Sequence, residues 1–372
     1  MKTLKSTLIL VVTICFLASC TSSSEVAPTP VTPNNIILTI VQLGNGEVKA
    51  TFSATNASFF KISFGLPGEI PQRVDGNSAN YTYKEKGDYK ITLQAHATEL
   101  IYVVDTKVVN MNAVALGLDP NAGYTSPESY AGYKLTWADE FNSSSISENW
   151  TFELGDGCPE LCGWGNEELE YYKKENTSLA DGKLIITAKQ ESEGGKSYTS
   201  SRMITKGKQS FTYGRIDIRA ILPKGQGLWP ALWMLGANID EVSWPKCGEI
   251  DIMEMIGGST EDRDRTTHGT VHWDNGGSYA NYGGSTKLAS GIFNDEFHVF
   301  SIDWDSEKIV WLLDGEAFHV IDIRPAGLDE FHKPMFFIFN VAVGGKWPGR
   351  PDGSTVFPQE MKVDYVRVFQ KE

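Results

Sequence analysis

The second half of this chain consists largely of short runs of residues that favour β-strands. β-Branched, aromatic and other apolar residues cluster between Gly, Asn, Asp and Pro residues, and no stretch carries a long helical period. This pattern favours an all-β fold, with two antiparallel sheets packed as a jelly roll. The predicted strands are Leu184–Gln190, Gly214–Leu222, Leu228–Leu235, Ile250–Ile256, Thr267–Trp273, His298–Trp304, Ile309–Leu313, Met335–Val343 and Met361–Phe369.

One of these runs carries three carboxylates. Glu249, Asp251 and Glu254 lie among isoleucines and methionines. In a regular strand, Glu249 and Asp251 share a face and Glu254 points away, but one extra residue after Asp251, a β-bulge, brings Glu254 back beside them. Two glutamates on one face suit retaining glycoside hydrolysis, with one as nucleophile and the other as acid/base. The alternative is a strand whose acids face solvent.

Aromatic residues mark the same half of the chain. All ten tryptophans lie between Trp137 and Trp347. Trp229 and Trp233 are four residues apart in one predicted strand, so both face the same way. Sugars present flat C–H faces, so such a pair suits a glycan site, although the two side chains could instead fill the core.

One set of polar residues and one histidine each have two interpretations. Arg215, Asp217 and Arg219 share one strand face and suit either sugar hydroxyls or a solvated outer surface. His272 is either a sugar contact or a structural histidine.

The first part of the chain reads as a smaller β-sandwich over residues 36–112. A Gly/Pro/Asn/Ser-rich connection follows it, and the second domain is predicted over residues 120–372. The segment Tyr81–Leu93 resembles the end of a PKD-type, immunoglobulin-like module but lacks that family's Trp-Asp-Phe-Gly-Asp-Gly core, and a spacer role is favoured. The predicted strands are Ile36–Val41, Val48–Ala54, Phe59–Phe64, Tyr81–Tyr83, Tyr89–Ala95 and Ile101–Val109.

The N-terminus has the pattern of an export signal. Two lysines precede the apolar run Leu8–Leu17, which is too short to span a bilayer. The sequence Leu17-Ala18-Ser19-Cys20 resembles a bacterial lipobox, which implies removal of residues 1–19 and lipidation of Cys20. Residues 20–35 would form a flexible tether. We expect an outer-membrane lipoprotein facing the cell surface or the periplasm. The alternative is an ordinary signal peptide with a chance cysteine.

The net charge limits the classes of binding partner, and the cysteines limit the possible disulfide, metal and thiol chemistry. A net charge of −14 argues against nucleic acid and favours a neutral polymer. Cys158 and Cys162 could bridge locally in an oxidising compartment. Cys247 reads as a small buried residue, and neither a zinc site nor a thiol nucleophile is expected.

Several separated motifs together resemble glycoside hydrolase family 16 in its bulged, laminarinase-like form. The resemblance covers roughly residues 130–372 and implies a concanavalin-like jelly roll. The matching segments are Trp137–Phe141, Gly163–Tyr172, Tyr213–Arg219, Gly227–Leu235, Glu249–Glu254, His272, Phe339–Gly345 and Val363–Val368.

The resemblance also implies residue roles. Glu249 would be the nucleophile, Glu254 the acid/base, and Asp251 would assist by a hydrogen bond to the nucleophile. The residues implied to line the sugar cleft are Asn166, Arg219, Trp229, Trp233, His272 and Asn340.

No cofactor is required by this chemistry, but the resemblance implies a structural calcium ion. Its ligands would be the carboxylates of Glu140 and Asp364 and the backbone carbonyl of Gly182.

These observations predict a monomeric endo-acting enzyme. It would hydrolyse β-1,3-glucan or mixed β-1,3/1,4-glucan with retention, as part of polysaccharide utilisation. The alternatives are a glycan-binding lipoprotein on an inactive scaffold, a hydrolase of another polysaccharide such as a galactan, and a transglycosylase that uses the same covalent intermediate.

Overall fold

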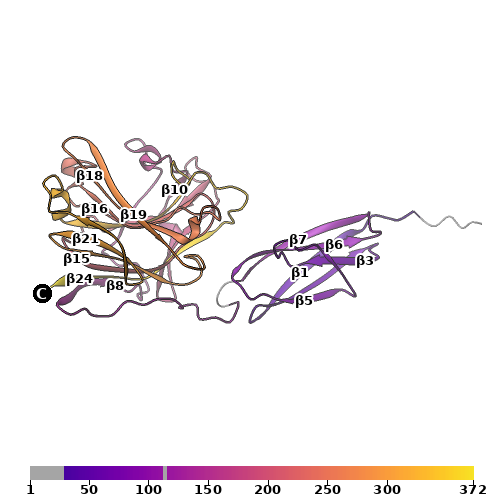
Figure 1. Cartoon of the computed structure of the whole chain (residues 1–372). Coiled ribbons are helices and arrows are strands. Elements are labelled where there is room, and N and C mark those ends of the chain that lie inside the picture. Colours follow the sequence, from indigo (N-terminus) through magenta and orange to yellow (C-terminus); the bar gives the residue numbers. More distant parts are fainter. Residues whose placement is uncertain (1–28, 112–114) are drawn as a thin grey trace, which may run out of the picture. The chain divides into compact units, whose positions relative to one another are not determined.

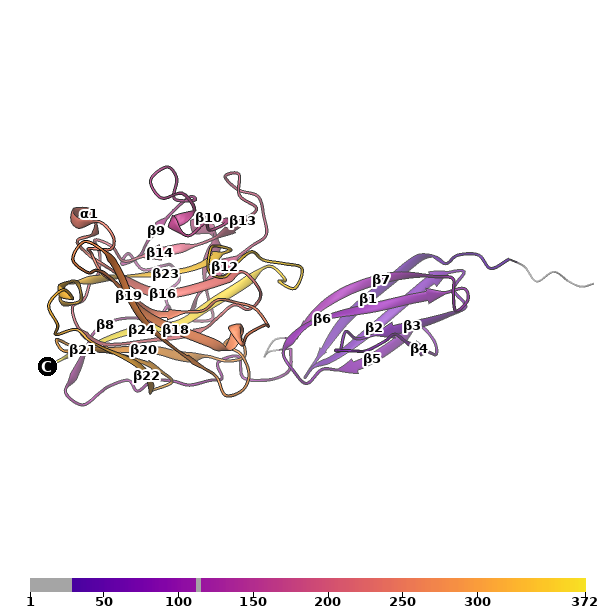
Figure 2. The same cartoon turned by 45° about the horizontal axis from the view of Figure 1, so that its top comes forward.

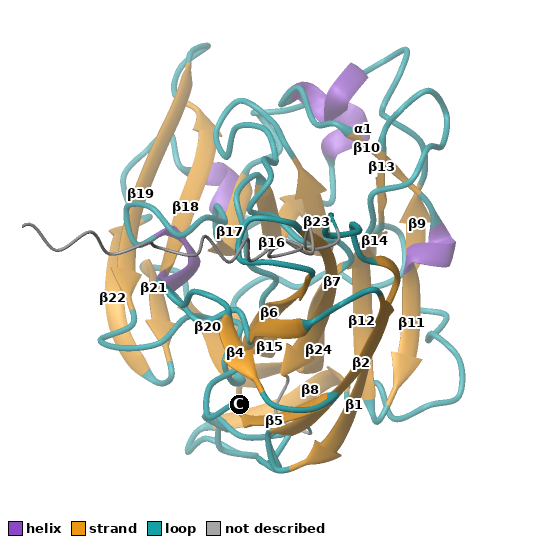
Figure 3. Ribbon diagram, turned by 90° about the vertical axis from the view of Figure 1, so that its right-hand side faces the viewer, coloured by secondary structure: helices purple, strands orange, loops and turns teal. Residues whose placement is uncertain are grey.

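The computed structural model describes residues 29–111 and 115–372. The signal segment and Cys20 lie outside these ranges. Contacts divide the chain into two compact units, Met1–Gly117 and Leu118–Glu372. The predicted all-β class is confirmed, and Figure 3 shows that helices are confined to short segments among the strands.

The first unit is a small sandwich of two antiparallel sheets. Val48, Ile91 and Leu93 are fully buried in its core, which draws apolar residues from both sheets. Its resemblance to an immunoglobulin-like module stays a prediction. One sheet has the order β1 (Asn34–Gly44), β2 (Glu47–Thr55), β5 (Ser78–Thr82), and the other β4 (Gln72–Val74), β3 (Phe59–Ser63), β6 (Gly87–His96), β7 (Tyr102–Met111).

The second unit consists of two larger sheets, seen as two layers in Figure 1. The seven-stranded sheet has the order β19 (Tyr279–Lys287), β18 (Thr266–Asp274), β17 (Glu249–Glu254), β16 (Leu228–Gly236), β23 (Met335–Val343), β14 (Arg202–Ile204), β9 (Thr151–Glu153). Figure 2 shows part of this order, from β16 through β23 and β14 to β9.

The eight-stranded sheet forms the other layer. Its order is β11 (Thr177–Ala180), β12 (Lys183–Ala188), β24 (Gln359–Lys371), β15 (Gly214–Ile221), β20 (His298–Trp304), β21 (Lys308–Leu313), β22 (Glu316–Asp322), with β8 (Tyr133–Asp139) also paired to β24.

The core lies between these two sheets. Alternate residues of β15, such as Ile216 and Ile218, are fully buried against residues of β16 and β17, such as Leu232 and Ile250. β23 is buried at every position, which explains its uninterrupted apolar sequence. The inner face of the seven-stranded sheet is therefore fixed by this core, and its polar residues are left to the opposite face.

Short elements connect the strands. They are the parallel pair β10 (Glu170–Tyr172) and β13 (Tyr198–Ser200), the helix α1 (Ile239–Val242), and the 3-10 helices η1 (Cys162–Gly165), η2 (Lys174–Asn176), η3 (Arg263–Arg265) and η4 (Asp329–His332). Within the described ranges, no helix is long and apolar enough to cross a membrane.

The cysteines of the second unit have the states that the sequence suggested. Cys158 and Cys162 form a disulfide bridge in the loop that leads into η1. Cys247 is free and fully buried, as predicted.

Candidate active site

The predicted bulge is present in β17. Asp251 pairs with Thr270 of β18, whereas Glu254 pairs with His268, so three residues on β17 span two on its neighbour. The register against β16 shifts at the same place. This extra residue corrects the parity of the strand, as expected from the sequence.

The corrected register places the three acids on one face of the sheet. Their partners are spaced by two on both flanking strands, and residues spaced by two share a face. Glu249, Asp251 and Glu254 pair with Leu235, Trp233 and Ala231 of β16, and lie opposite His272, Thr270 and His268 of β18. We call this surface the acid-bearing face.

Each of the two glutamates accepts a hydrogen bond from an indole N–H. Trp229 Nε1 donates to Oε1 of Glu254 at 3.0 Å, and Trp244 Nε1 donates to Oε2 of Glu249 at 2.9 Å. Trp229 and Trp233 lie on the same side of β16, as predicted. Neither is fully buried, so these side chains do not simply fill the core.

Asp251 is held from both sides of the sheet. His272 Nε2 lies 3.0 Å from Oδ2 of Asp251 and 3.7 Å from Oε1 of Glu249. The other ring nitrogen, Nδ1, lies 2.8 Å from the hydroxyl of Tyr279. From the core side, Trp311 Nε1 donates to the backbone carbonyl of Asp251 at 2.8 Å. The middle acid is therefore fixed more firmly than its neighbours.

Burial raises the pKa values of all three acids, and the neighbouring negative charges raise those of Glu249 and Glu254 further. At Glu249, burial and then the charge of Asp251 raise the pKa to about 8, against a lowering by His272 and by the Trp244 N–H. At Glu254, burial and then the charges of Asp251 and Glu249 raise the pKa well above its usual value. Burial also raises the pKa of Asp251, while a hydrogen bond with Glu249 lowers it. Such a trio retains protons near neutral pH, which suits a site that needs both an acid and a base.

Asn340 lies on β23, between β16 and β14. Trp233 Nε1 donates to Oδ1 of Asn340 at 2.8 Å, and Asn340 pairs with Ala231 across β16 and β23. Asn166 follows η1, and its side-chain amide donates to Glu168 at 3.1 Å. The structure therefore brings Asn340, Trp229, Trp233 and His272 to the acid-bearing face, and their roles in substrate binding stay predictions.

The prediction that Arg219 lines the sugar cleft is wrong. Arg219 lies on β15, in the other sheet, and is 3% exposed. Its guanidinium donates to Asp364 at 2.8 Å and to the backbone carbonyls of Asn121 and Tyr124. Strand parity correctly groups Arg219 with Arg215 and Asp217, but it does not indicate which layer the strand joins. The segment before β8 covers this face.

The residues predicted to bind calcium do not fit a calcium site as the structure places them. Both carboxylate oxygens of Glu140 accept hydrogen bonds from Arg367, at 2.7 and 2.8 Å. Asp364 is paired with Arg219. A cation would have to displace two guanidinium groups, because each carboxylate already has a positive partner. The calcium ion stays a prediction, and no step below depends on it.

Several residues near the acids were not found from the sequence. Trp244 and Tyr279 touch Glu249 and His272, and Trp347 packs edge-on against Trp229 with ring centroids 5.6 Å apart. All three are more than a third exposed. The local signal was an aromatic residue within or directly after a polar or glycine-rich segment.

Arg202 was missed as well. It lies on β14 opposite Asn340, and its guanidinium carbon is 4.6 Å from the ring of Trp164 and 4.8 Å from that of Trp233. It also forms an ion pair with Glu153. The chain thus places a stacked arginine beside Trp233.

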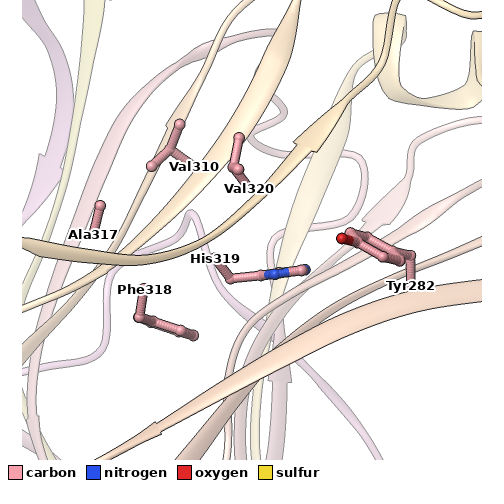
Figure 4. A pocket seen from close by; sticks show the side chains of 6 residues that line it. All are labelled: Tyr282, Val310, Ala317, Phe318, His319 and Val320. Carbon is pink, nitrogen blue, oxygen red and sulfur yellow. The ribbon is translucent and has the colours of Figure 1, made fainter.

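A separate hollow of about 450 Å³ lies between β19 and the pair β21–β22 (Figure 4). Tyr282 lines this hollow. On β19 it is one residue from Asn281, which pairs with His272, so its side chain points to the face of the sheet opposite the acid-bearing face. No carboxylate lines the hollow. The residues lining it are Tyr282, Val310, Ala317, Phe318, His319 and Val320.

Comparisons with known proteins agree with this geometry. The family model for glycosyl hydrolases family 16 matches residues 163–367. A second model, for the beta-glucan synthesis-associated protein SKN1/KRE6/Sbg1, matches residues 80–241. The chain is 38% identical to the clotting factor G alpha subunit of Tachypleus tridentatus and 38% identical to a beta-glucanase of Rhodothermus marinus. These alignments each cover 64% of this chain, but 34% of the first protein and 85% of the second.

A solved structure is similar in both sequence and fold. The laminarinase catalytic domain from Thermotoga maritima MSB8, in complex with cetyltrimethylammonium bromide, is 46% identical, with a TM-score of 0.59. The match covers 64% of this chain and 99% of that domain. The family match and the laminarinase structure identify this acid-bearing jelly roll as a glycoside hydrolase. The chain belongs to glycosyl hydrolases family 16.

Proposed function

We propose that this enzyme cleaves internal bonds of β-1,3-glucan or mixed β-1,3/1,4-glucan with retention of configuration. The observation that carries the proposal is the bulge in β17, which sets Glu249 and Glu254 on one face with Asp251 between them. The names of the relatives support the choice of a β-glucan, since they include a beta-glucanase and a laminarinase.

In the proposed mechanism, Glu249 attacks the anomeric carbon of the scissile bond. The C–O bond to the leaving sugar breaks while Glu254 donates its proton to that oxygen, and a glycosyl–Glu249 ester forms. Glu254, now ionised, takes a proton from water, which attacks the anomeric carbon and releases Glu249. The raised pKa of Glu254 suits its role as the acid.

Asp251 and the indole of Trp244 keep Glu249 available as a nucleophile. The Trp244 N–H and His272 both lower the pKa of Glu249, against the larger raising effect of burial. A proton shared between Asp251 and Glu249 would allow the pair to carry a single negative charge in a buried setting. His272 fixes Asp251 for that purpose.

The test is a digest of laminarin, barley β-glucan, lichenan and agarose with the purified protein. We expect oligosaccharides from the glucans, with the β-anomer appearing first when the products are followed by NMR. Glu249→Gln is the matched control. Its migration should still be retarded in a native gel that contains laminarin, but it should release no reducing sugar. Binding without cleavage by the wild type would favour the inactive-scaffold alternative, products from agarose would favour a galactan, and lengthening oligosaccharides would indicate transglycosylation.

We also propose that the mature enzyme is exported and lipid-anchored at Cys20. The support is the lipobox-like sequence alone. Cells expressing the full chain should incorporate labelled palmitate into the protein and retain it in the membrane fraction. Cys20→Ser should lose both properties, and an unlabelled wild type would contradict the anchor.

A further inference from the structure

Two carboxyl groups are buried together at β10 and the residues just before it. Glu168 is 4% exposed and Glu170, on β10, is fully buried. The proposed mechanism uses neither of them. Burying two carboxylates together is costly unless a cation or a proton compensates them.

Glu168 accepts hydrogen bonds at both of its oxygens. Asn166 Nδ2 donates to Oε1 at 3.1 Å, and the hydroxyl of Tyr172 donates to Oε2 at 3.0 Å. Both donors are neutral, and a proton on either oxygen would compete with them. Glu168 therefore has no oxygen that could hold a proton without competing with one of these donors.

Glu170 is bonded differently. Its Oε2 accepts the backbone N–H of Val343 at 2.6 Å. Its Oε1 is buried, and within the described ranges no donor reaches it. A proton on Oε1 makes that atom a donor, and the carboxylate of Glu168 is a neighbouring acceptor. Burial and then the charge of Glu168 raise the pKa of Glu170 well above its usual value, in agreement with this reading.

The hydrogen bonds that end at Glu168 all run in one direction. Trp233 Nε1 donates to Asn340 Oδ1, and Asn340 Nδ2 donates to the Tyr172 hydroxyl at 3.1 Å. Tyr172 then donates to Glu168. Because Asn340 and Tyr172 each accept one of these bonds and donate the next, the acceptor Glu168 at the end sets the orientation of the whole series.

We propose that Glu168 and Glu170 share one proton, held on Glu170, and that this pair orients Asn166 and Asn340 for substrate. Glu168 and Glu170 are positioning residues, since they would act on substrate only through these two amides. Loss of the shared proton would put two negative charges together and disturb both amides. The assignment of the amides to substrate binding rests on the proposed function, whereas the proton assignment does not.

Other charged and titratable groups surround the pair. Lys196 donates to the backbone carbonyl of Glu168 and lies 3.6 Å from Asp156. Arg202 is engaged by Glu153. Tyr198, which pairs with Glu170 across β10 and β13, and Tyr172 complete the set. The charge of Glu168 contributes to the raised pKa of Arg202, but within the described ranges no lysine or arginine forms an ion pair with either carboxylate, so a proton is the compensating charge in direct contact with the pair.

The first test does not depend on enzyme activity. Infrared difference spectra of wild type minus Glu170→Gln at neutral pH should show the carbonyl band of a protonated carboxyl group, lost in the variant. The same difference taken with Glu168→Gln should show a carboxylate band instead. Carboxylate bands lost in Glu170→Gln would overturn the proposal whether or not the protein cleaves any glucan.

The second test compares the same substitution at the two positions. Glu170→Gln keeps a donor toward Glu168 and an acceptor for Val343, so KM and kcat at neutral pH should stay within about twofold. Glu168→Gln replaces an acceptor by a donor facing another donor, so KM should rise about tenfold with a smaller change in kcat.

The pH dependence separates positioning from simple packing. As the pH rises and the pair loses its proton, the KM of the wild type should increase, whereas Glu170→Gln has no proton to lose and should keep its KM. Equal behaviour of the two glutamine variants, or a KM of Glu170→Gln that rises at alkaline pH as it does in the wild type, would contradict the proposal. If Glu168→Gln does not fold, Tyr172→Phe interrupts the same series and should raise KM with both carboxyls intact.

Discussion

Both sheets of the catalytic unit carry buried acids, but the two sheets treat them differently. In the eight-stranded sheet, Asp217 is fully buried and accepts hydrogen bonds from Tyr130 at 2.6 Å, Ser301 at 2.7 Å and Arg215 at 3.0 Å. Its charge is balanced by a guanidinium. In the seven-stranded sheet, the only basic side chain within 4 Å of the three acids, among the described residues, is His272.

This difference separates acids that stabilise from acids that react. A buried carboxylate with its own cation has no free valence for a ligand, and removing the cation is costly. A buried acid without one has a raised pKa and lowers the stability of the fold until substrate arrives. The acid-bearing face is therefore a locally unfavourable arrangement supported by the well-paired layer beneath it.

The largest effect should follow from removing the acids on the seven-stranded sheet. Glu249→Gln and Glu254→Gln should each lower kcat by at least about a thousandfold, because nucleophile and proton donor act directly on the scissile bond. Initial rates of reducing-sugar release measure this. The matched variant on the other sheet, Asp217→Asn, should keep kcat/KM per folded molecule within a few fold. A comparable loss in Asp217→Asn would remove the contrast between the sheets.

The reverse contrast should appear in stability. Arg219→Met leaves Asp364 without its partner and frees the carbonyls of Asn121 and Tyr124, so the free energy of unfolding should fall by about 3 kcal/mol. Urea denaturation followed by fluorescence measures it. At urea concentrations below the unfolding transition, the specific activity should be unchanged. A rise in KM without a loss of stability would instead show that Arg219 contacts the sugar.

The stability of the acid-bearing face should depend on pH in a defined direction. The folded-state pKa of Glu249, about 8, exceeds its ordinary value of 4.5, so folding takes up a proton between these pH values and the free energy of unfolding falls as pH rises through that window. Glu249→Gln removes this cost. At about pH 8 the inactive variant should be more stable than wild type by on the order of 4 kcal/mol, with little difference near pH 4. Thermal unfolding across this range would refute the idea if the wild type were the more stable protein at high pH.

The sequence predicted the parts of this contrast that are local. The alternation in β17, with three acids among isoleucines and methionines, was sufficient to infer the bulge, and the even spacing of Trp229 and Trp233 placed them together. Both inferences use the twofold period of a strand, which needs no knowledge of the rest of the chain.

The errors arose where the answer depends on distant segments. The face of β15 that carries Arg219 is covered by residues almost a hundred positions earlier, at Asn121 and Tyr124. Trp244 comes from a loop, and Tyr279 begins β19 directly after a glycine-rich turn, so no local period indicates that either side chain reaches the acids. The strand β19 was not predicted, because its central Gly283 and Gly284 weaken the β signal although the close approach of Thr270 and His319 requires them.

The smallest effect should come from the indole that contacts the nucleophile. The Trp244 N–H lowers the pKa of Glu249, so Trp244→Phe should raise that pKa and move the acidic limb of kcat/KM to higher pH. Activity at the acidic end should fall a few fold relative to wild type, and activity on the plateau should change less. Trp347→Phe is the matched control, because Trp347 is similarly exposed and packs against Trp229. Within the described ranges, its indole donates no hydrogen bond to an acid. Trp347→Phe should alter KM without moving the limb. If both variants shift the profile equally, the effect belongs to aromatic packing around the acids, and Glu249 would have no hydrogen-bond support of its own.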